Sequence, residues 1–323
     1  GRAYIEEVQK YSIAASIKHF PGDGVDERDQ HLLASVNSLS VKEWDDTYGM
    51  VYRNCIDAGA KTVMVGHIMQ PAYSKLLRPG IKDEEIMPGL LAPELLNELL
   101  RDKLGFNGLI ITDSTTMAGM GTVMPREKAV PLVIASGCDM FLFTKNLEED
   151  IFFMTQGVKN GVITKERLDD AVTRILALKA SLGLHKKNNI PDESAARRIV
   201  GCSEHREVSR QIADAGITLV KEEKGVLPIS PDKYKRILVY KKEGQKSAFG
   251  GGVKEGACDK FIEKLKEHGF DVTVFVPGGG WEGMAAPVSD VTEHYDMILY
   301  LISLATKSNQ TVVRIEWAEP MGA

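Results

Sequence analysis

The segment KHFPGDGVDERDQH occupies residues 18–31 and follows a short apolar run, Ile13–Ile17, that is typical of a buried strand. Lys18 and His19, two possible hydrogen-bond donors, stand at the end of this run. A Pro-Gly-x-Gly turn comes next, and its glycines on both sides of Asp23 permit backbone angles that other residues avoid. The segment therefore predicts a loop that begins at a strand end and can bend sharply or move.

This loop ends in an Asp-x-His pair, Asp29 and His31. An Asp two residues before a His can accept a hydrogen bond from one ring nitrogen and leave the other nitrogen for proton transfer. Asp26 and Glu27 are rival carboxylates in the same loop, and we interpret them as solvated charges. Taken alone, the segment would be interpreted as an ordinary polar surface loop, so a functional role can be inferred only together with the rest of the chain.

The pattern of an apolar strand followed by groups capable of chemistry recurs along residues 1–184. The predicted strands are Ile13–Ile17, Thr62–Val65, Leu109–Thr112 and Met140–Phe143. They lead to Lys18 and His19, to His67, to Asp113, and to Thr144 with Lys145. Helices are predicted at residues 41–58, 93–105 and 128–136, and a last helix is capped by Thr164 and ends at Gly183. In a βα barrel the carboxyl ends of all strands open on one face, so these polar groups should meet there.

The order of elements predicts an α/β chain in two parts. Residues 1–184 supply four βα units where a closed (β/α)8-type barrel needs eight, so we expect the C-terminal half of such a barrel. Residues 185–204 are a predicted polar linker, and residues 205–323 are a predicted α/β sandwich-type domain, apparently incomplete. Its predicted elements are strands Ile217–Val220, Ile237–Tyr240, Val272–Val276, Met297–Ile302 and Thr311–Ile315, and helix Ala257–His268. We therefore expect this chain to be the middle of a longer protein.

Composition excludes several classes of function. The chain has 323 residues, 43% of them hydrophobic and 26% charged, as in a soluble protein of two domains. A net charge of −5 without any basic tract argues against nucleic-acid binding, and no apolar run is long enough for a membrane span. The absence of a signal peptide at the start predicts a cytoplasmic protein. The scattered cysteines lack metal-ligand spacing and are predicted to be buried free thiols: Cys55, Cys138, Cys202 and Cys258. The glycine runs at 250–252 and 278–280 lack a phosphate-binding fingerprint and predict turns or mobile loops.

Residues 18–31 also resemble a family signature, Lys-His-Phe-Pro-Gly-x-Gly-x-x-x-x-Asp-x-His, of the β-N-acetylglucosaminidase branch of glycoside hydrolase family 3. The segment departs from that pattern at Asp23, where many relatives have His, and at Gln30, where Ser or Thr is usual. Neither change removes a group that the chemistry needs. The segment LIITDSTTM, residues 109–117, is similar to the nucleophile segment of the same family.

The resemblance implies retaining hydrolysis of terminal β-linked N-acetylglucosamine. Asp113 would be the nucleophile that forms a glycosyl-enzyme, and His31, oriented by Asp29, would be the acid/base group in place of a second carboxylate. The residues implied to contact the sugar are Lys18, His19, His67 and Met117. This chemistry needs neither a metal nor a cofactor.

Two alternatives stay open. An imidazole adds no second negative charge to the site, so an anionic acceptor such as phosphate could replace water and make the protein a phosphorylase. A carbohydrate-binding relative with a degenerate site is disfavoured, because the nucleophile, the acid/base group and its orienting Asp are all present. The sequence identifies neither the oligomeric state nor the aglycone, which could be a peptidoglycan fragment, a chitooligosaccharide or a glycan.

Overall fold

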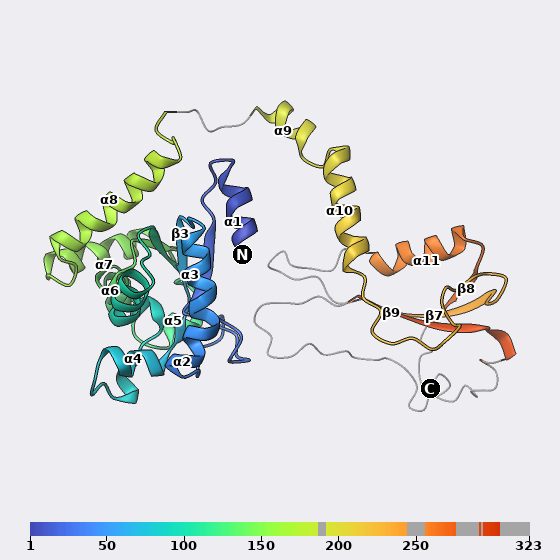
Figure 1. Cartoon of the computed structure of the whole chain (residues 1–323), viewed down its shortest axis with the longest axis horizontal. Helices are drawn as coiled ribbons and strands as arrows, with labels where there is room; N and C mark the ends of the chain where they lie inside the picture. The colour runs from blue at the N-terminus through green and yellow to red at the C-terminus, as the bar shows by residue number, and fades with distance from the viewer. Residues whose placement is uncertain (187–191, 244–255, 276–290, 292, 304–323) are drawn as a thin grey trace. The chain divides into compact units, whose positions relative to one another are not determined.

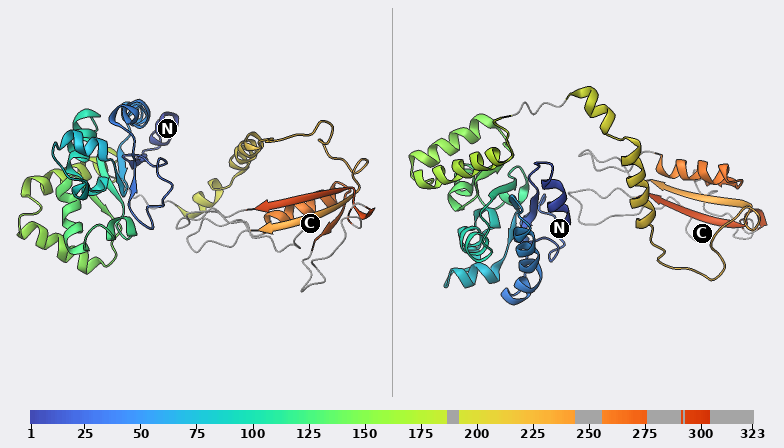
Figure 2. Two further views of the ribbon diagram at one scale, coloured as in Figure 1. Left: turned by 90° about the horizontal axis from the view of Figure 1, so that it is seen from below. Right: turned by 45° about the horizontal axis from the view of Figure 1, so that its top comes forward.

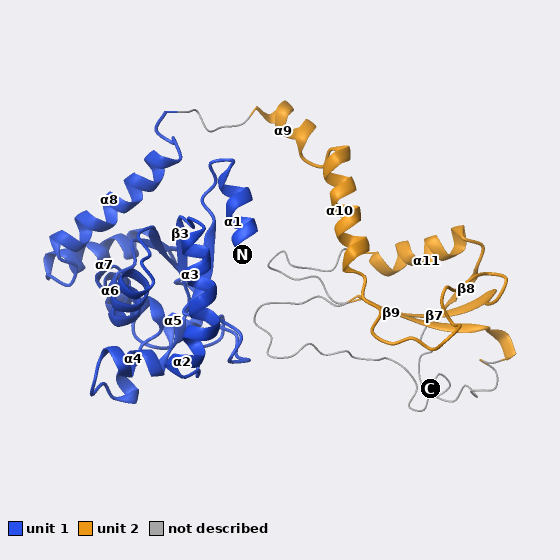
Figure 3. Cartoon of the chain, in the orientation of Figure 1, with its two compact units in different colours: residues 1–190 blue, residues 191–323 orange. Residues whose placement is uncertain are grey.

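The computed structural model describes residues 1–186, 192–243, 256–275, 291 and 293–303 (Figure 1). The chain divides into two compact units, Gly1–Ile190 and Pro191–Ala323 (Figure 3). Helix α9 (Glu193–Ile199) lies within the segment predicted as a linker. Each unit contains a parallel sheet of its own, and each is described by itself.

The sheet of the first unit has the order β1-β3-β5-β6, and every pair in it is parallel. Its strands are β1 (Ser16–Phe20), β3 (Thr62–Val65), β5 (Leu109–Ser114) and β6 (Met140–Leu142). Because consecutive strands of this sheet are neighbours joined by helical crossovers, their carboxyl ends lie along one edge. The predicted α/β fold of barrel type is confirmed. A second pair, β2 (Ser35–Val36) and β4 (Ile68–Met69), lies in the loops after β1 and β3.

The first strand is displaced from its predicted position. The sequence predicted Ile13–Ile17, whereas β1 is Ser16–Phe20, so Lys18 and His19 lie within the strand. The reason is Phe20, which is fully buried and packs edge-on against Trp44 and Tyr52. Likewise β5 extends two residues beyond its apolar part, so that Asp113 also belongs to a strand. Strand residues project from a hydrogen-bonded frame, which places their side chains more firmly than a loop does.

The helices of the first unit follow the strands. The predicted helix at 41–58 consists of α2 (Val41–Trp44), the π-helical η1 (Asp45–Gly49) and α3 (Met50–Asp57). The helix predicted at 93–105 is the π-helical η4 (Glu94–Lys103). Thr164 caps α8 as predicted, by accepting from the Arg167 N–H. The remaining elements are α1 (Arg2–Gln9), α4 (Pro71–Leu77), η2 (Asp83–Glu85), η3 (Gly89–Leu91), α5 (Ala118–Gly121), α6 (Arg126–Ser136), α7 (Leu147–Lys159) and α8 (Lys165–Ser181). The sequence analysis had not predicted α4 or α7.

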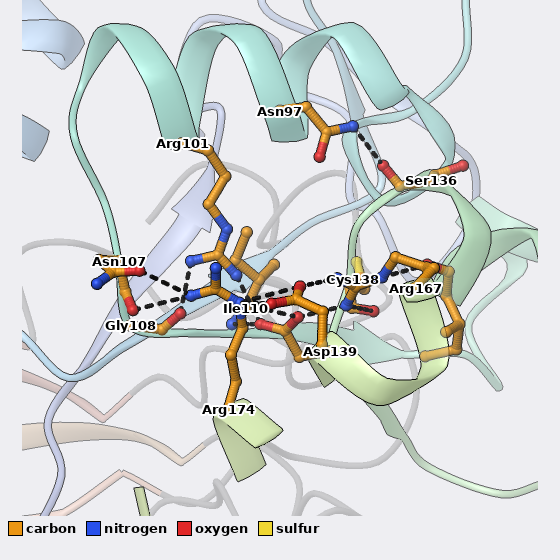
Figure 4. A network of polar contacts seen from close by, with 12 residues as sticks. Asn97, Arg101, Asn107, Gly108, Ile110, Ser136, Cys138, Asp139, Arg167 and Arg174 are labelled. Carbon is orange, nitrogen blue, oxygen red and sulfur yellow. Dashed lines mark hydrogen bonds and ion pairs between the residues drawn. The ribbon is translucent and has the colours of Figure 1, made fainter. Parts of the chain in front are cut away.

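A network of charged side chains ties the amino end of β5 to that of β6 (Figure 4). Its centre is Asp139, whose side chain is 0% exposed. Arg101 donates to Asp139 Oδ2 at 2.6 Å, and Arg167 donates to Oδ1. Arg174 lies 4.0 Å from Oδ1 and also pairs with Asp170. A buried carboxylate is stable only when it is paired and hydrogen-bonded in this way.

Asp139 also sets the register of the two strands. Its carboxylate accepts from the Ile110 N–H at 2.8 Å, and its own N–H donates to the Ile110 carbonyl at 2.8 Å. Ile110 lies three residues before Asp113 on β5. The network therefore fixes the strand that carries Asp113, although it lies at the opposite end of that strand.

The second unit has a three-stranded parallel sheet of order β8-β7-β9. The strands are β7 (Arg236–Glu243), β8 (Asp271–Val274) and β9 (Met297–Ser303), and α10 (Ser203–Gly216) precedes them. Helix α11 (Ala257–Glu267) lies against one face of the sheet (Figure 2). It buries Ile262 and Leu265 against Ile237 and Val239. This alternation agrees with the α/β pattern predicted for residues 237–302.

One predicted strand of the second unit is wrong. Residues 217–220 form no strand, and Ile217 and Val220 are 81% and 91% exposed. This apolar run pairs with no described strand: the described sheet consists of β7 between β8 and β9, and an apolar run without a hydrogen-bonded neighbour forms no strand. The predicted strand at 311–315 and the glycine runs at 250–252 and 278–280 lie outside the described residues.

The cysteines are free thiols, and Cys55, Cys138 and Cys258 are buried as predicted. Cys202 is partly exposed, so the prediction of burial is wrong for this residue. In the described part of the chain, no helix combines the length and the apolar character that crossing a membrane requires. Within the same residues, no three His, Cys, Asp or Glu side chains are grouped as a metal site would require.

Candidate active site

Asp113 and His19 face each other at the carboxyl ends of β5 and β1. His19 Nε2 lies 3.5 Å from Asp113 Oδ2, and the Asp113 side chain is 17% exposed. The other carboxylate oxygen, Oδ1, accepts from the Ser114 N–H at 2.7 Å. Asp113 is thus a partly shielded carboxylate with one oxygen held by the backbone and the other beside an imidazole.

His19 is held from its other side by Asp23. The two side chains meet at 2.6 Å, between His19 Nδ1 and Asp23 Oδ2. An ionised carboxylate can only accept, so Asp23 fixes a proton on Nδ1 and turns Nε2 toward Asp113. The Tyr48 hydroxyl donates to the Asp23 backbone carbonyl at 2.5 Å and so anchors this turn.

The Asp29–His31 pair forms as the spacing predicted. His31 Nδ1 lies 2.7 Å from Asp29 Oδ1, which also accepts from the His31 backbone N–H at 2.8 Å. The His31 side chain is 42% exposed, so its Nε2 side is accessible. The His31 carbonyl accepts from the Ala118 N–H at 3.3 Å, which brings the pair next to the segment after Asp113.

His67 is fully buried, and its Nε2 lies 3.0 Å from the Ser114 carbonyl. A carbonyl can only accept, so Nε2 carries the proton, and Nδ1 has no hydrogen-bond partner in the described residues. Burial lowers the pKa of His67, the charge of Asp113 opposes this, and the charges of His19 and His31 add to it. Asp113, His19 and His31 are therefore all close enough to His67 to act on it electrostatically.

The lowered pKa predicts a stability that falls at acid pH. Unfolded His67 would take up a proton near its ordinary value of 6.5, while folded His67 takes one up only at lower pH. Its contribution is therefore complete above about pH 6.5 and declines as the pH falls below that value. We expect the unfolding midpoint to fall more steeply from pH 7 to pH 5 in the wild type than in His67→Gln, which keeps a donor for Ser114. Thermal unfolding at several pH values measures these midpoints, and an equal dependence on pH in the two proteins would contradict the prediction.

The other two sugar-contacting candidates differ in exposure. Lys18 is exposed and makes no hydrogen bond or ion pair within the described part of the chain, so its ammonium group is available. Met117 is 8% exposed and stands directly before α5, four residues after Asp113. Lys18, His19, His67, Asp113 and Met117 thus all lie at or next to the carboxyl ends of neighbouring strands.

Two residues have contacts that the sequence analysis did not anticipate. Gln30 is buried and bonds to both Asp23 and the His67 backbone. Its only sequence signal was its departure from the usual Ser or Thr inside the Asp-x-His pair. Asp26 is not the solvated charge that was predicted. It accepts from Arg28 at 2.5 Å and from the Val36 N–H at 2.8 Å, and the hydrogen bonds from Arg28 hold its pKa well below its ordinary value.

Comparison with known proteins places this site in a family. Residues 1–178 match the family model for the N-terminal domain of glycosyl hydrolase family 3. The whole chain is 63% identical over 323 residues to a beta-N-acetylglucosaminidase/beta-glucosidase of Cellulomonas fimi. The chain belongs to glycoside hydrolase family 3. It spans 57% of the length of that relative.

Two solved structures have the same fold as this chain. A beta-glucoside phosphorylase, BglX, is 42% identical, with a TM-score of 0.91 over 99% of this chain and 58% of its own. A glycoside hydrolase family 3 beta-N-acetylglucosaminidase from Paenibacillus sp. str. FPU-7 has a TM-score of 0.73. It is 22% identical, covers 94% of this chain and 55% of its own, and is similar in fold alone.

Proposed function

We propose that the protein containing this chain is a retaining exo-glycosidase that removes terminal β-linked N-acetylglucosamine. One observation carries the proposal. A strand-end carboxylate, Asp113, has an imidazole 3.5 Å away, and a second imidazole, His31, is paired with Asp29 on a loop bonded to the segment after β5. These are the nucleophile and the proton donor that double displacement at a sugar requires.

In the first step the ionised Asp113 carboxylate attacks the anomeric carbon. A bond forms between its oxygen and that carbon, and the bond to the leaving oxygen breaks with its electron pair. His31 Nε2–H donates its proton to the leaving oxygen, while Asp29 stabilises the imidazolium through Nδ1. The products of this step are a glycosyl-Asp113 ester, the free aglycone alcohol and a neutral His31.

In the second step the neutral His31 acts as the base. Its Nε2 takes a proton from a water molecule, whose oxygen attacks the anomeric carbon while the bond to Asp113 breaks. The sugar leaves with its original configuration, and Asp113 and His31 regain their starting charge states. The exposed Lys18 ammonium and His19 are proposed to hold sugar hydroxyls, and Met117 is proposed to border the sugar ring. His67, which is fully buried, is proposed to lie at the same subsite.

The His31 role predicts a loss that depends on the leaving group. In the complete protein, His31→Ala should lower kcat/KM for 4-methoxyphenyl β-N-acetylglucosaminide by about 10²–10⁴-fold, the usual contribution of general acid catalysis. A 2,4-dinitrophenyl leaving group needs no proton. For that substrate, His31→Ala should therefore lower the rate of the first step far less. Steady-state kinetics with both substrates measures this difference. An equal loss for the two leaving groups would contradict the assignment.

A second candidate function is phosphorolysis of the same glycosides. Two observations favour it: the 42% identical protein of known structure is a beta-glucoside phosphorylase, and the proposed acid/base group is an imidazole, which does not repel a phosphate anion. The test adds inorganic phosphate to the complete protein and assays for the sugar 1-phosphate. Free sugar alone as product supports hydrolysis, and sugar 1-phosphate as the main product would replace hydrolysis by phosphorolysis. Running the assay on β-glucosides in parallel decides the sugar preference, since the Cellulomonas fimi relative carries both names.

A further inference from the structure

The Gln30 side chain joins loops that follow different strands. Its Nε2 donates to Asp23 Oδ1 in the loop after β1, and its Oε1 accepts from the His67 N–H after β3 at 2.6 Å. Its backbone carbonyl accepts from the Gly119 N–H after β5 at 3.1 Å. Gln30 is 8% exposed, so these bonds are shielded from water, and the loss of a partner there is costly. One residue therefore connects the ends of β1, β3 and β5.

Only a side-chain amide of this length can make both hydrogen bonds at position 30. The Asp23 carboxylate can only accept and the His67 N–H can only donate, so the Gln30 amide fits in a single orientation. A carboxylate at position 30 would face the carboxylate of Asp23, and a serine hydroxyl would be too short to reach either partner. The backbone leaves room for the amide: a Cβ at Gly66 would lie 2.6 Å from Gln30 Oε1, and one at Gly119 would lie 2.7 Å from the Gln30 carbonyl.

The contacts continue from Gln30 to Asp113. Asp23 uses Oδ1 for Gln30 and Oδ2 for His19 Nδ1, at 2.6 Å in the second case. His19 Nε2 then lies 3.5 Å from Asp113 Oδ2. If Gln30 no longer holds Asp23, His19 loses the partner that fixes its ring and its tautomer beside Asp113.

Gln30 also stands between Asp29 and His31 in the sequence. The carbonyls of Gln30 and His31 are bonded in succession to the N–H groups of Gly119 and Ala118. The backbone of the Asp29–His31 pair is thus fastened to the segment that follows Asp113. The sequence predicted a loop that can bend sharply or move, and these bonds fasten its last residues, Gln30 and His31, to the neighbouring segment.

We propose that Gln30 and Asp23 are positioning residues that act as one pair, setting His19 against Asp113 and holding the Asp29–His31 pair beside them. The proposal rests on the proposed function for the roles of Asp113 and His31. Asp23 and Gln30 are the two positions at which the loop departs from the family pattern, and their direct bond makes each residue dependent on the other.

Kinetics of the complete protein test the pair. Gln30→Ser should lower kcat/KM for the 4-methoxyphenyl glycoside by about 10–100-fold, since displacement of a reacting group by about 1 Å has effects of this size. The loss should be smaller for the 2,4-dinitrophenyl glycoside, because that substrate does not need His31. Asp26→Asn is the matched control: it removes the Asp26–Arg28 ion pair of the same loop but touches neither Gln30 nor His19. The ratio of the kcat/KM values for the two substrates should therefore stay as in the wild type. If the ratio of kcat/KM for the two glycosides in Gln30→Ser equalled that of the wild type, the proposal would be overturned.

An exchange of side-chain types tests the mutual dependence. Gln30→Glu alone places two carboxylates together and should lower kcat/KM by about 10-fold or more. Adding Asp23→Asn restores one amide facing one carboxylate, so the double variant should recover most of that loss. Losses that simply multiply in the double variant would show that the two residues act independently and would also overturn the proposal.

Hydrogen exchange gives a readout that does not depend on turnover. The His67 amide should exchange faster in Gln30→Ser than in the wild type or in Asp26→Asn, because its acceptor is lost. Unchanged exchange at His67 in Gln30→Ser would overturn the proposed pair. If the wild type turned over neither glycoside, the proposed function would fail, and the exchange rates would still decide whether Gln30 holds these loops.

Discussion

Replacing Asp113 by alanine in the complete protein should reduce kcat for 2,4-dinitrophenyl β-N-acetylglucosaminide by on the order of 10⁴-fold, because the covalent step loses its nucleophile. The excellent leaving group makes acid catalysis dispensable, so the loss reports on the nucleophile alone. Within the described residues, Asp113 makes one hydrogen bond, to the Ser114 N–H, and one longer contact, to His19, so the variant should still fold. Steady-state rates and the unfolding midpoint, measured together, check both expectations.

The product of rescue by azide identifies the face of the sugar on which each group acts. In Asp113→Ala an azide ion can occupy the space of the carboxylate, displace dinitrophenolate and give the α-glycosyl azide. In His31→Ala the glycosyl-Asp113 ester still forms, and azide attacking from the other side should give the β-glycosyl azide. Asp102→Ala removes an exposed carboxylate from the end of η4, before β5 begins, and should keep the wild-type rate. More than a tenth of the wild-type rate in Asp113→Ala would contradict its role.

Replacing Asp139 by alanine should cost about 3–5 kcal/mol of unfolding free energy, the usual penalty for removing one partner of a buried ion pair. The change leaves Arg101 and Arg167 facing one another without their shared carboxylate, and the Ile110 N–H loses its acceptor. A loss of this size is a large part of the stability of a typical domain. Urea unfolding, followed by near-ultraviolet circular dichroism of the buried aromatic residues around Trp44, measures it.

Asp170 provides the matched control for this prediction. It belongs to the same network and pairs with Arg167 and Arg174, but its side chain is 44% exposed. Asp170→Ala should therefore cost about 1 kcal/mol or less, as exposed pairs do. Similar losses in the two variants would show that burial of Asp139 is not what makes the network stabilising.

Much of the strand pattern could be predicted from local sequence. The apolar runs located β3 and identified β5, β6, β7 and β9, since a buried strand needs several consecutive apolar residues to cover it. The same criterion failed at Ile217–Val220, because an apolar run becomes a strand only where it pairs with another strand, and this run pairs with none of the described ones. It also misplaced β1 by three residues, since packing of Phe20 against Trp44 is not visible in a local window.

Local sequence was enough to show which polar groups lie at or near the strand ends, and that Asp29 and His31 can pair, because a spacing of two residues fixes that contact locally. Three other features follow from the folded chain alone: His19 lies between Asp23 and Asp113, Gln30 bonds to His67, and three arginines gather at Asp139. The physical reason is that such contacts join residues far apart in the chain. Their distances depend on the register of neighbouring strands and on packing across the unit, which no local pattern of residues encodes.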